Sequence, residues 1–217
     1  MSTPSLFPQW LGLQKYEEGL RKQEQLCALI KGQRKGYVLG LEHEIVVTLG
    51  LRGSRDEDLI DRDALKRKNV PIIKVPRGGQ ATLHSPGQLV IYPLLPLKDW
   101  KIGVRAYVEC LEKSSQNFLE LYGIKSFRKE EEPGLYTSQG KIVFIGVQVS
   151  QGISRHGIAI NVNNDLSYFS WIRSCGKLED TFDRLVTKEP LENLFQNWAS
   201  CFKRQLTSLL SLNFLKS

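Results

Sequence analysis

The chain has 217 residues, of which 41% are hydrophobic and 24% charged, and this balance predicts one globular domain, residues 1–217, with a full core. Its apolar runs are far too short to span a bilayer, and the N-terminal residues lack the features of a signal peptide, so we expect a cytoplasmic protein with no membrane partner. The net charge of +7 favours anionic partners, but the basic residues are scattered without interleaved aromatics, so we expect no nucleic-acid partner.

Hydrophobic periodicity predicts an alternation of helices and strands along the chain. We expect a helix over 11–31, strands over 36–41 and 44–50, a loop or mobile segment over 51–69, and strands over 70–75 and 88–95. The clearest helix follows at 99–122, then strands at 124–128, 134–137, 141–150 and 155–163, an irregular stretch at 164–188 and a last helix at 190–212. These elements predict an α+β fold, a mixed sheet with helices on one side.

A polar block separates two of the expected strands. It runs from Arg77 to Gln88 and contains Gly78 and Gly79, whose backbone can approach a ligand closely. Two glycines alone would indicate a β-hairpin with a glycine bulge. The whole block, with its many side-chain donors, favours a binding function instead.

Cysteine chemistry is the second signal. The four cysteines stand at 27, 110, 175 and 201, with no CxxC spacing and no local metal-ligand pattern among the histidines, so we expect neither disulfides nor a metal. Three of the cysteines fall within expected helices. Cys175, next to Gly176 in a polar stretch, is the candidate nucleophile because a nucleophile needs access and a nearby amide donor.

Lys141 opens an apolar strand after a turn. Its commoner interpretation is a solvent-facing lysine at a strand edge. The functional interpretation is a lysine beside the cysteine, where an ammonium within about 4–6 Å would lower the pKa of the thiol by roughly 1–3 units.

Taken together, these residues resemble one family along most of the chain, the lipoyl(octanoyl) transferases of lipoate biosynthesis. The resemblance is carried by the block from Arg77 to Tyr92, by Lys141 and Cys175 at a spacing of 34 residues, and by further matches in the first helix and the later strands. These further matches are Leu11-Gly12, Tyr16, Gln23, Glu42-His43, Thr48-Leu49-Gly50, Ile142, Ile145-Gly146-Val147, His156-Gly157-Ile158-Ala159, Asn161-Val162-Asn163, Asp165-Leu166, Phe169, Ile172 and Gly176.

Three positions depart from the family pattern. Leu83 stands where the family usually has tyrosine, Ser85 where it has glycine, and Ser174 where proline precedes the cysteine. None of these changes removes the nucleophile or the lysine.

The resemblance implies the fold of biotin and lipoate protein ligases, with a mixed sheet flanked by helices. It implies Cys175 as the acyl-thioester nucleophile and Lys141 as its acid/base partner, with no cofactor. The residues that would line the acyl and thioester site are Arg77, Gly78, Gly79, Gln80, Ala81, Thr82, Leu83, His84, Phe144, Ile145, Gly146, Gly157, Ile158 and Ala159.

The implied reaction moves an octanoyl group from acyl carrier protein to a lysine of lipoyl domains in 2-oxoacid dehydrogenases and the glycine cleavage H protein. Burial of six methylenes at about 0.8 kcal/mol each contributes roughly 5 kcal/mol to recognition of the chain. Two alternatives stay open at this point. The first is an ATP-dependent lipoate or biotin ligase, which needs no nucleophilic cysteine, or another acyltransferase or amidotransferase of the same fold. The second is a non-catalytic basic binding module for nucleic acid.

Overall fold

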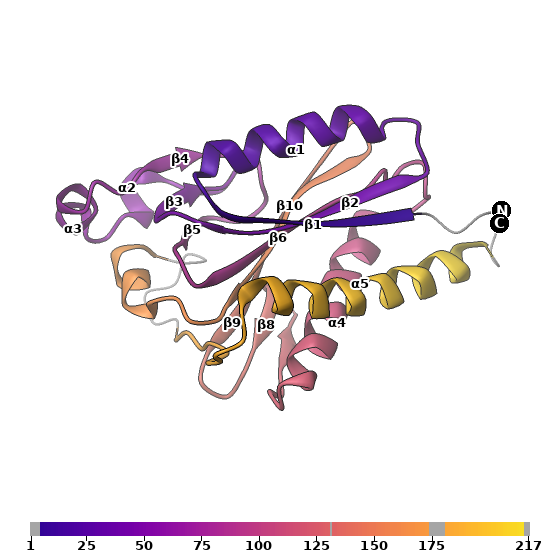
Figure 1. The fold of residues 1–217 in the computed structure, drawn as a ribbon. Coiled ribbons are helices and arrows are strands. Elements are labelled where there is room, and N and C mark those ends of the chain that lie inside the picture. The colour runs from indigo at the N-terminus through magenta and orange to yellow at the C-terminus, as the bar shows by residue number, and fades with distance from the viewer. Residues whose placement is uncertain (1–4, 131, 174–180, 215–217) are drawn as a thin grey trace.

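The computed structural model describes residues 5–130, 132–173 and 181–214 (Figure 1). The strands are β1 (Ser5–Gln14), β2 (Lys35–His43), β3 (Val46–Leu49), β4 (Ile72–Lys74), β5 (Ala81–His84), β6 (Gln88–Leu94), β7 (Phe127–Lys129), β8 (Glu132–Tyr136), β9 (Lys141–Ser150) and β10 (Ile153–Asn161). The helices are α1 (Tyr16–Ile30), α2 (Arg55–Asp58), α3 (Arg62–Arg67), α4 (Val104–Leu121), the 3-10 helix η1 (Leu166–Trp171) and α5 (Leu191–Phe214).

Two sheets organise the described chain. The larger has the strand order β1-β2-β6-β10-β9-β8-β7, in which only the β1–β2 pairing is parallel. The smaller has the order β4-β3-β5, with β3 parallel to β4 and antiparallel to β5. Both sheets are mixed, whereas the sequence predicted a single mixed sheet.

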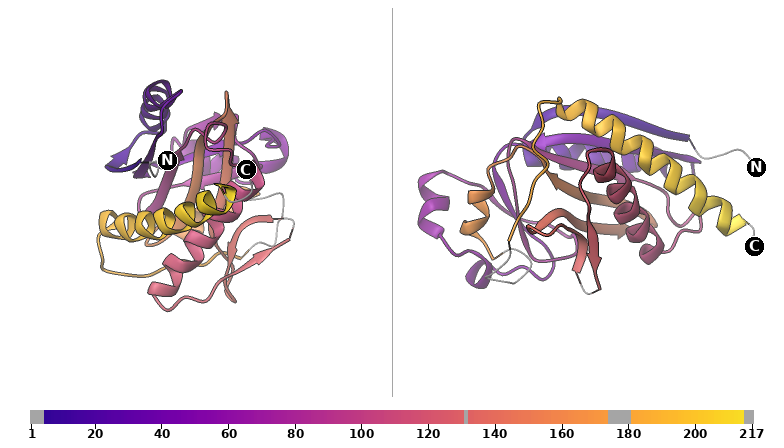
Figure 2. Two further views of the ribbon diagram at one scale, coloured as in Figure 1. Left: turned by 90° about the vertical axis from the view of Figure 1, so that its right-hand side faces the viewer. Right: turned by 90° about the horizontal axis from the view of Figure 1, so that it is seen from below.

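Helices cover both faces of the larger sheet, so the expectation of helices on one side was wrong (Figures 1 and 2). Successive residues of β2 point to opposite faces. Val38 packs in a core cluster with residues of α4 and α5, whereas Leu39 packs in a second cluster with Leu26 and Ile30 of α1. The helical periodicity of α1 predicted a helix but carried no information about which side of the sheet it would cover.

The first helix begins later than its hydrophobic pattern indicated. Residues 11–14 belong to β1, in which Leu13 pairs with Glu42 of β2 after a register shift. Gly12 has a φ of +68°, and the helix starts only at Tyr16. Pairing with a distant strand therefore overrides the local helical spacing of these residues.

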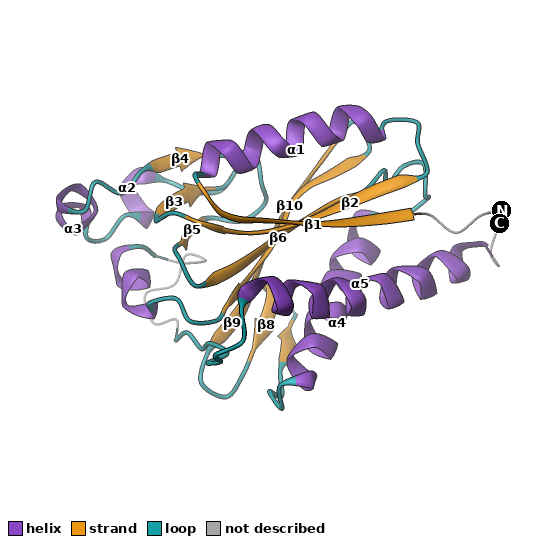
Figure 3. Ribbon diagram, viewed as in Figure 1, coloured by secondary structure: helices purple, strands orange, loops and turns teal. Residues whose placement is uncertain are grey.

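The charged stretch over 51–69 forms short helices rather than the expected loop (Figure 3). Ser54 caps α2 by accepting a hydrogen bond from the amide of Asp56, and Asp61 caps α3 by accepting one from Ala64. Leu65 is the apolar anchor of α3, since it is 2% exposed in the core beneath α1. Such caps satisfy amides that a short helix leaves without partners.

The later elements follow the predicted order. The helix predicted over 99–122 is α4 and the last helix is α5, while η1 interrupts the stretch predicted to be irregular. In the part of the chain that the structure describes, no helix combines the length and apolarity needed to cross a membrane.

Candidate functional site

A cavity of about 660 Å³ lies between the larger sheet, the polar block and the start of α1. Its floor includes one cross-strand row of apolar side chains, in which Phe144 of β9 pairs with Ala159 of β10, and Ala159 pairs with Val90 of β6. Every predicted substrate-binding residue except Leu83 lines this cavity, and Lys141 lines it too. Residues distant in the sequence therefore meet around one space.

Leu83 lies apart from the cavity wall. Its side chain is 0% exposed and packs in the core cluster that also contains Leu26 of α1. Alternation along β5 explains this, because Thr82 and His84 line the cavity while Leu83 points to the other face. The departure from the family's tyrosine at this position thus lies in the core.

The polar block is held as a strand and a tight loop rather than as a hairpin with β6. Its strand β5 pairs with β3, so that Thr82 lies opposite Thr48. Gly79 has a φ of +87°, and its carbonyl approaches Gly50 so closely that a Cβ on Gly50 would lie 2.4 Å from it. The amide of Gly78 donates to the carbonyl of Val147 at 3.0 Å, so this predicted donor holds the loop against β9.

Arg77 is a buried cation in the cavity wall. Its guanidinium donates to the carbonyl and the hydroxyl of Thr48 at 2.9 and 2.8 Å, and to the carbonyl of Gly78 at 2.9 Å. A Cβ on Gly146 would lie 3.0 Å from the Cδ atom of Arg77, so the glycine leaves room for this side chain. The guanidinium is thereby fixed above β9.

Lys141 is only 2% exposed, which rules out its interpretation as a solvent-facing residue at a strand edge. Its Nζ lies 5.1 Å from the ring centroid of Tyr136 and 5.3 Å from that of Phe144, within cation–π range of both. A Cβ on Gly134 would lie 3.1 Å from the Cε atom of Lys141. The lysine is therefore packed between aromatic rings and a glycine that makes space for it.

The backbone of Lys141 is bound to the chain that follows the segment 174–180. Its amide donates to the carbonyl of Thr181 at 2.8 Å, and its carbonyl accepts from the amide of Asp183 at 3.0 Å. Phe182 stacks on Phe169 of η1 with a centroid distance of 4.4 Å. Cys175, Ser174 and Gly176 lie outside the described residues.

The three other cysteines lie in helices, as the sequence predicted. Cys110 in α4 and Cys201 in α5 are buried free thiols, and Cys27 in α1 is half-buried. Burial raises the pKa of Cys110 to about 12 and also raises the pKa of Cys27. Neither of these two thiols has the lowered pKa of a reactive nucleophile.

Sequence reasoning did not assign five polar residues of the cavity wall, namely Tyr16, Arg52, Tyr92, Glu132 and His156. The hydroxyl of Tyr92 lies 2.8 Å from Nε2 of the buried His43, whose Nδ1 lies 3.1 Å from the carbonyl of Gln14. The ring of Tyr16 packs on the imidazole of His43 with a centroid distance of 4.9 Å. Family matches at Tyr16, at Glu42-His43, in the block that ends at Tyr92 and at His156 were the available signal, but nothing local linked them to one another.

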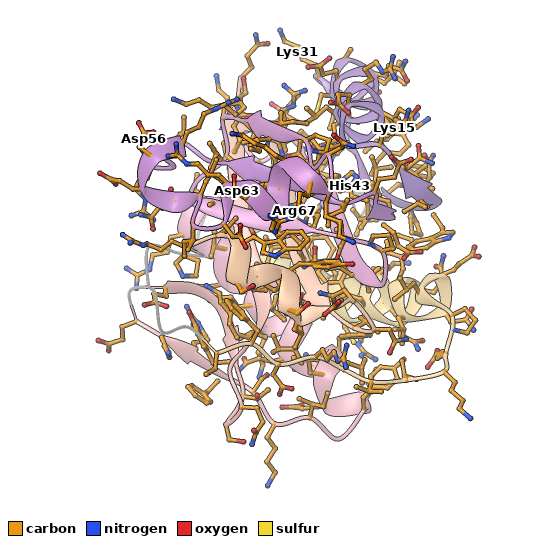
Figure 4. All side chains as sticks on the ribbon, turned by 90° about the vertical axis from the view of Figure 1, so that its left-hand side faces the viewer. Lys15, Lys31, His43, Asp56, Asp63 and Arg67 are labelled. Atoms are coloured by element: carbon orange, nitrogen blue, oxygen red, sulfur yellow. The ribbon has the colours of Figure 1, made fainter. Side chains whose placement is uncertain are left out.

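The histidines of this region are held neutral. Burial lowers the pKa of His43 to about 4, that of His84 to about 3 and that of His156 to about 3. The charge of Arg77 lowers the pKa values of His84 and His156 further. Figure 4 shows His43 within the body of the molecule while Lys31 projects outward.

Neutrality fixes the direction of the hydrogen bonds around His43. The carbonyl of Gln14 can only accept, so Nδ1 of His43 carries the proton and Nε2 is left as an acceptor. Tyr92 therefore donates its hydroxyl proton to Nε2.

Within residues 5–130, 132–173 and 181–214, no three His, Cys, Asp or Glu side chains group as metal ligands would.

Comparison with known proteins identifies the family. The model of the lipoyl protein ligase A/B catalytic domain matches residues 15–208. The chain belongs to this family. A relative from Solibacter usitatus, named octanoyltransferase, is 43% identical over 167 residues, which are 76% of each chain. A second octanoyltransferase, from Thermoanaerobacter sp. (strain X514), is 38% identical over 88% of this chain and 86% of the relative.

Solved structures share the fold at low sequence identity. A bi-partite lipoate protein ligase from Thermoplasma acidophilum has a TM-score of 0.68 at 15% identity and covers 95% of this chain and 84% of its own. Biotin protein ligase from Aquifex aeolicus has a TM-score of 0.51 at 14% identity, covering 97% and 72%. These comparisons confirm the predicted fold, the predicted family and the acyltransferase class.

Proposed function

We propose that this enzyme transfers an octanoyl group from acyl carrier protein to a lysine of a lipoyl domain, through a thioester on Cys175. The observation that carries the proposal is the buried Lys141 beside an apolar cavity floor, in a chain whose relatives are octanoyltransferases. A buried cation at one end of an apolar chain site suits an acyl thioester, whose reacting end is polar and whose tail is not.

The first half-reaction exchanges one thioester for another. The Cys175 thiolate attacks the thioester carbonyl, the new S–C bond forms, and the carrier leaves as a thiolate, so the step needs no ATP. The ammonium of Lys141 favours the thiolate. The anchoring of Thr181 and Asp183 on the backbone of Lys141 supports this pairing, because Thr181 follows Cys175 by only six residues.

The second half-reaction forms the amide. The ε-amine of the acceptor lysine attacks the acyl-enzyme, the C–N bond forms, and the C–S bond to Cys175 breaks. One proton must leave the nitrogen and one must reach the departing sulfur. Lys141, acting as acid and base, carries this proton from one to the other.

Intact-protein mass spectrometry tests the proposal. After mixing with octanoyl-loaded acyl carrier protein, the enzyme should gain one octanoyl group that hydroxylamine removes, and adding a lipoyl domain should transfer the group to that domain. Cys175→Ala should abolish the adduct, while the matched variant Cys27→Ala should keep it. An adduct that persists in Cys175→Ala, or transfer that occurs only with ATP, would refute the proposal and favour a ligase.

A further inference from the structure

The polarity of the cavity lining changes along β9. Lys141 begins the strand, the apolar row of Phe144, Ala159 and Val90 follows three residues later, and Gly146 follows after two more. At about 3.4 Å per residue, Gly146 lies roughly 17 Å along the strand from Lys141. An acyl chain attached near Lys141 and lying over the apolar row therefore points its methyl end towards Gly146.

Polar groups close this far end. Arg77 lies over Gly146, and Tyr92, two residues beyond Val90 on β6, contacts His156 with a ring-centroid distance of 6.2 Å. Tyr16 enters from the start of α1 and packs on His43 with a ring-centroid distance of 4.9 Å. We call Tyr16, Arg77, Tyr92 and His156 the polar cap; all four line the cavity.

The polar cap is rigid as well as polar. Arg77 is tied to Thr48, and Tyr92 to His43, by the buried hydrogen bonds described above. Gly19 of α1 packs on His43 so tightly that a Cβ there would lie 3.0 Å from the imidazole Cε1. The cap therefore cannot withdraw without breaking buried hydrogen bonds, which is costly.

We propose that the polar cap sets the longest acyl chain that the enzyme accepts. This inference rests on the proposed acyl transfer and adds its chain-length specificity. Each methylene placed over the apolar row gains from burial. A longer chain instead presses its methyl end against hydroxyl and guanidinium groups, which lose water and gain no hydrogen bond in exchange.

Tyr16→Phe is the most selective variant, because it removes one hydroxyl from the cavity wall and leaves Tyr92 bonded to His43. The assay compares kcat/KM for octanoyl, decanoyl and dodecanoyl thioesters of acyl carrier protein. The ratio of dodecanoyl to octanoyl should rise about tenfold, the effect of removing one buried polar group that a long chain leaves unsatisfied.

Tyr107→Phe is the matched control. Tyr107 is 0% exposed, donates its hydroxyl to the carbonyl of Pro93 at 3.1 Å, and packs on the α4 and α5 side of the sheet. Its loss should leave the chain-length ratio unchanged. Thermal unfolding of both variants checks that they are folded.

The outcomes separate the two proposals. If wild-type enzyme takes up octanoyl but Tyr16→Phe shows the wild-type ratio, the chain-length inference is wrong and acyl transfer stands. An equal rise in Tyr107→Phe would also overturn the inference, because it would show a general loosening. Wild-type enzyme that takes up no acyl group from any thioester would overturn both.

Discussion

Acidification should unfold this protein through its three buried histidines. His43, His84 and His156 have folded-state pKa values of about 4, 3 and 3, against about 6.5 in an unfolded chain. Below pH 6.5 these histidines become protonated in the unfolded state but stay neutral in the folded state. Their contribution to stability is therefore present above pH 6.5 and is lost as the pH falls towards 4 and 3.

The size of this loss in stability follows from the same pKa shifts of the three histidines. Each histidine changes the free energy of unfolding by about 1.4 kcal/mol per pH unit between the two pKa values. From pH 7 to pH 5 this amounts to about 2 kcal/mol for each histidine and about 6 kcal/mol for all three. A domain with a total stability of about 5–15 kcal/mol would lose a large part of it.

Urea unfolding at pH 7, 6 and 5 measures the loss in the free energy of unfolding. A histidine variant tests whether the buried imidazoles cause this loss. His156 has a φ of +56°, which asparagine tolerates, so His156→Asn removes one imidazole with little backbone strain. The variant should lose about 2 kcal/mol less than wild type over this range. Equal pH dependence in wild type and variant would refute the assignment to buried neutral histidine.

Four further outcomes are expected. Lys141→Ala should slow both acylation and transfer and raise the pKa of the reactive thiol, measured by alkylation rate against pH; an unchanged profile contradicts the proposed role. Gly134→Ala should destabilise the fold, measured by thermal unfolding, because its φ is +133° and a Cβ would lie 2.3 Å from the carbonyl oxygen of Val143. Arg77→Lys should lower the free energy of unfolding by about 3 kcal/mol, because lysine cannot reproduce both hydrogen bonds to Thr48. A loss below about 1 kcal/mol in urea titrations would contradict this role of the two hydrogen bonds. Added salt should reduce kcat/KM with acyl carrier protein but not with a small octanoyl thioester, because salt screens the attraction between an acidic carrier and this chain of net charge +7. Equal salt sensitivity of both donors would contradict charge-assisted docking.

The sequence alone determined much of the architecture. The periodic apolar faces predicted α4 and α5, and the apolar runs predicted β6, β9 and β10, because burial of one element's own face leaves a local pattern. The combination of the polar block, Lys141 and the cysteine pattern indicated the family. These signals are carried by neighbouring residues or by motifs at a set spacing.

Only the tertiary structure decided which residues share the cavity and how deeply they are buried. Residues 11–14 look helical by spacing, yet they pair with β2, which lies beyond α1 in the chain. Lys141 looks like a strand-edge lysine, yet aromatic rings enclose it. Tyr16, His43 and Tyr92 come from three separate elements and meet in one cluster, in which Tyr92 is bonded to His43 and Tyr16 packs on the imidazole. Hydrogen-bond partners and cavity walls arise from contacts between distant segments, and no local periodicity records them.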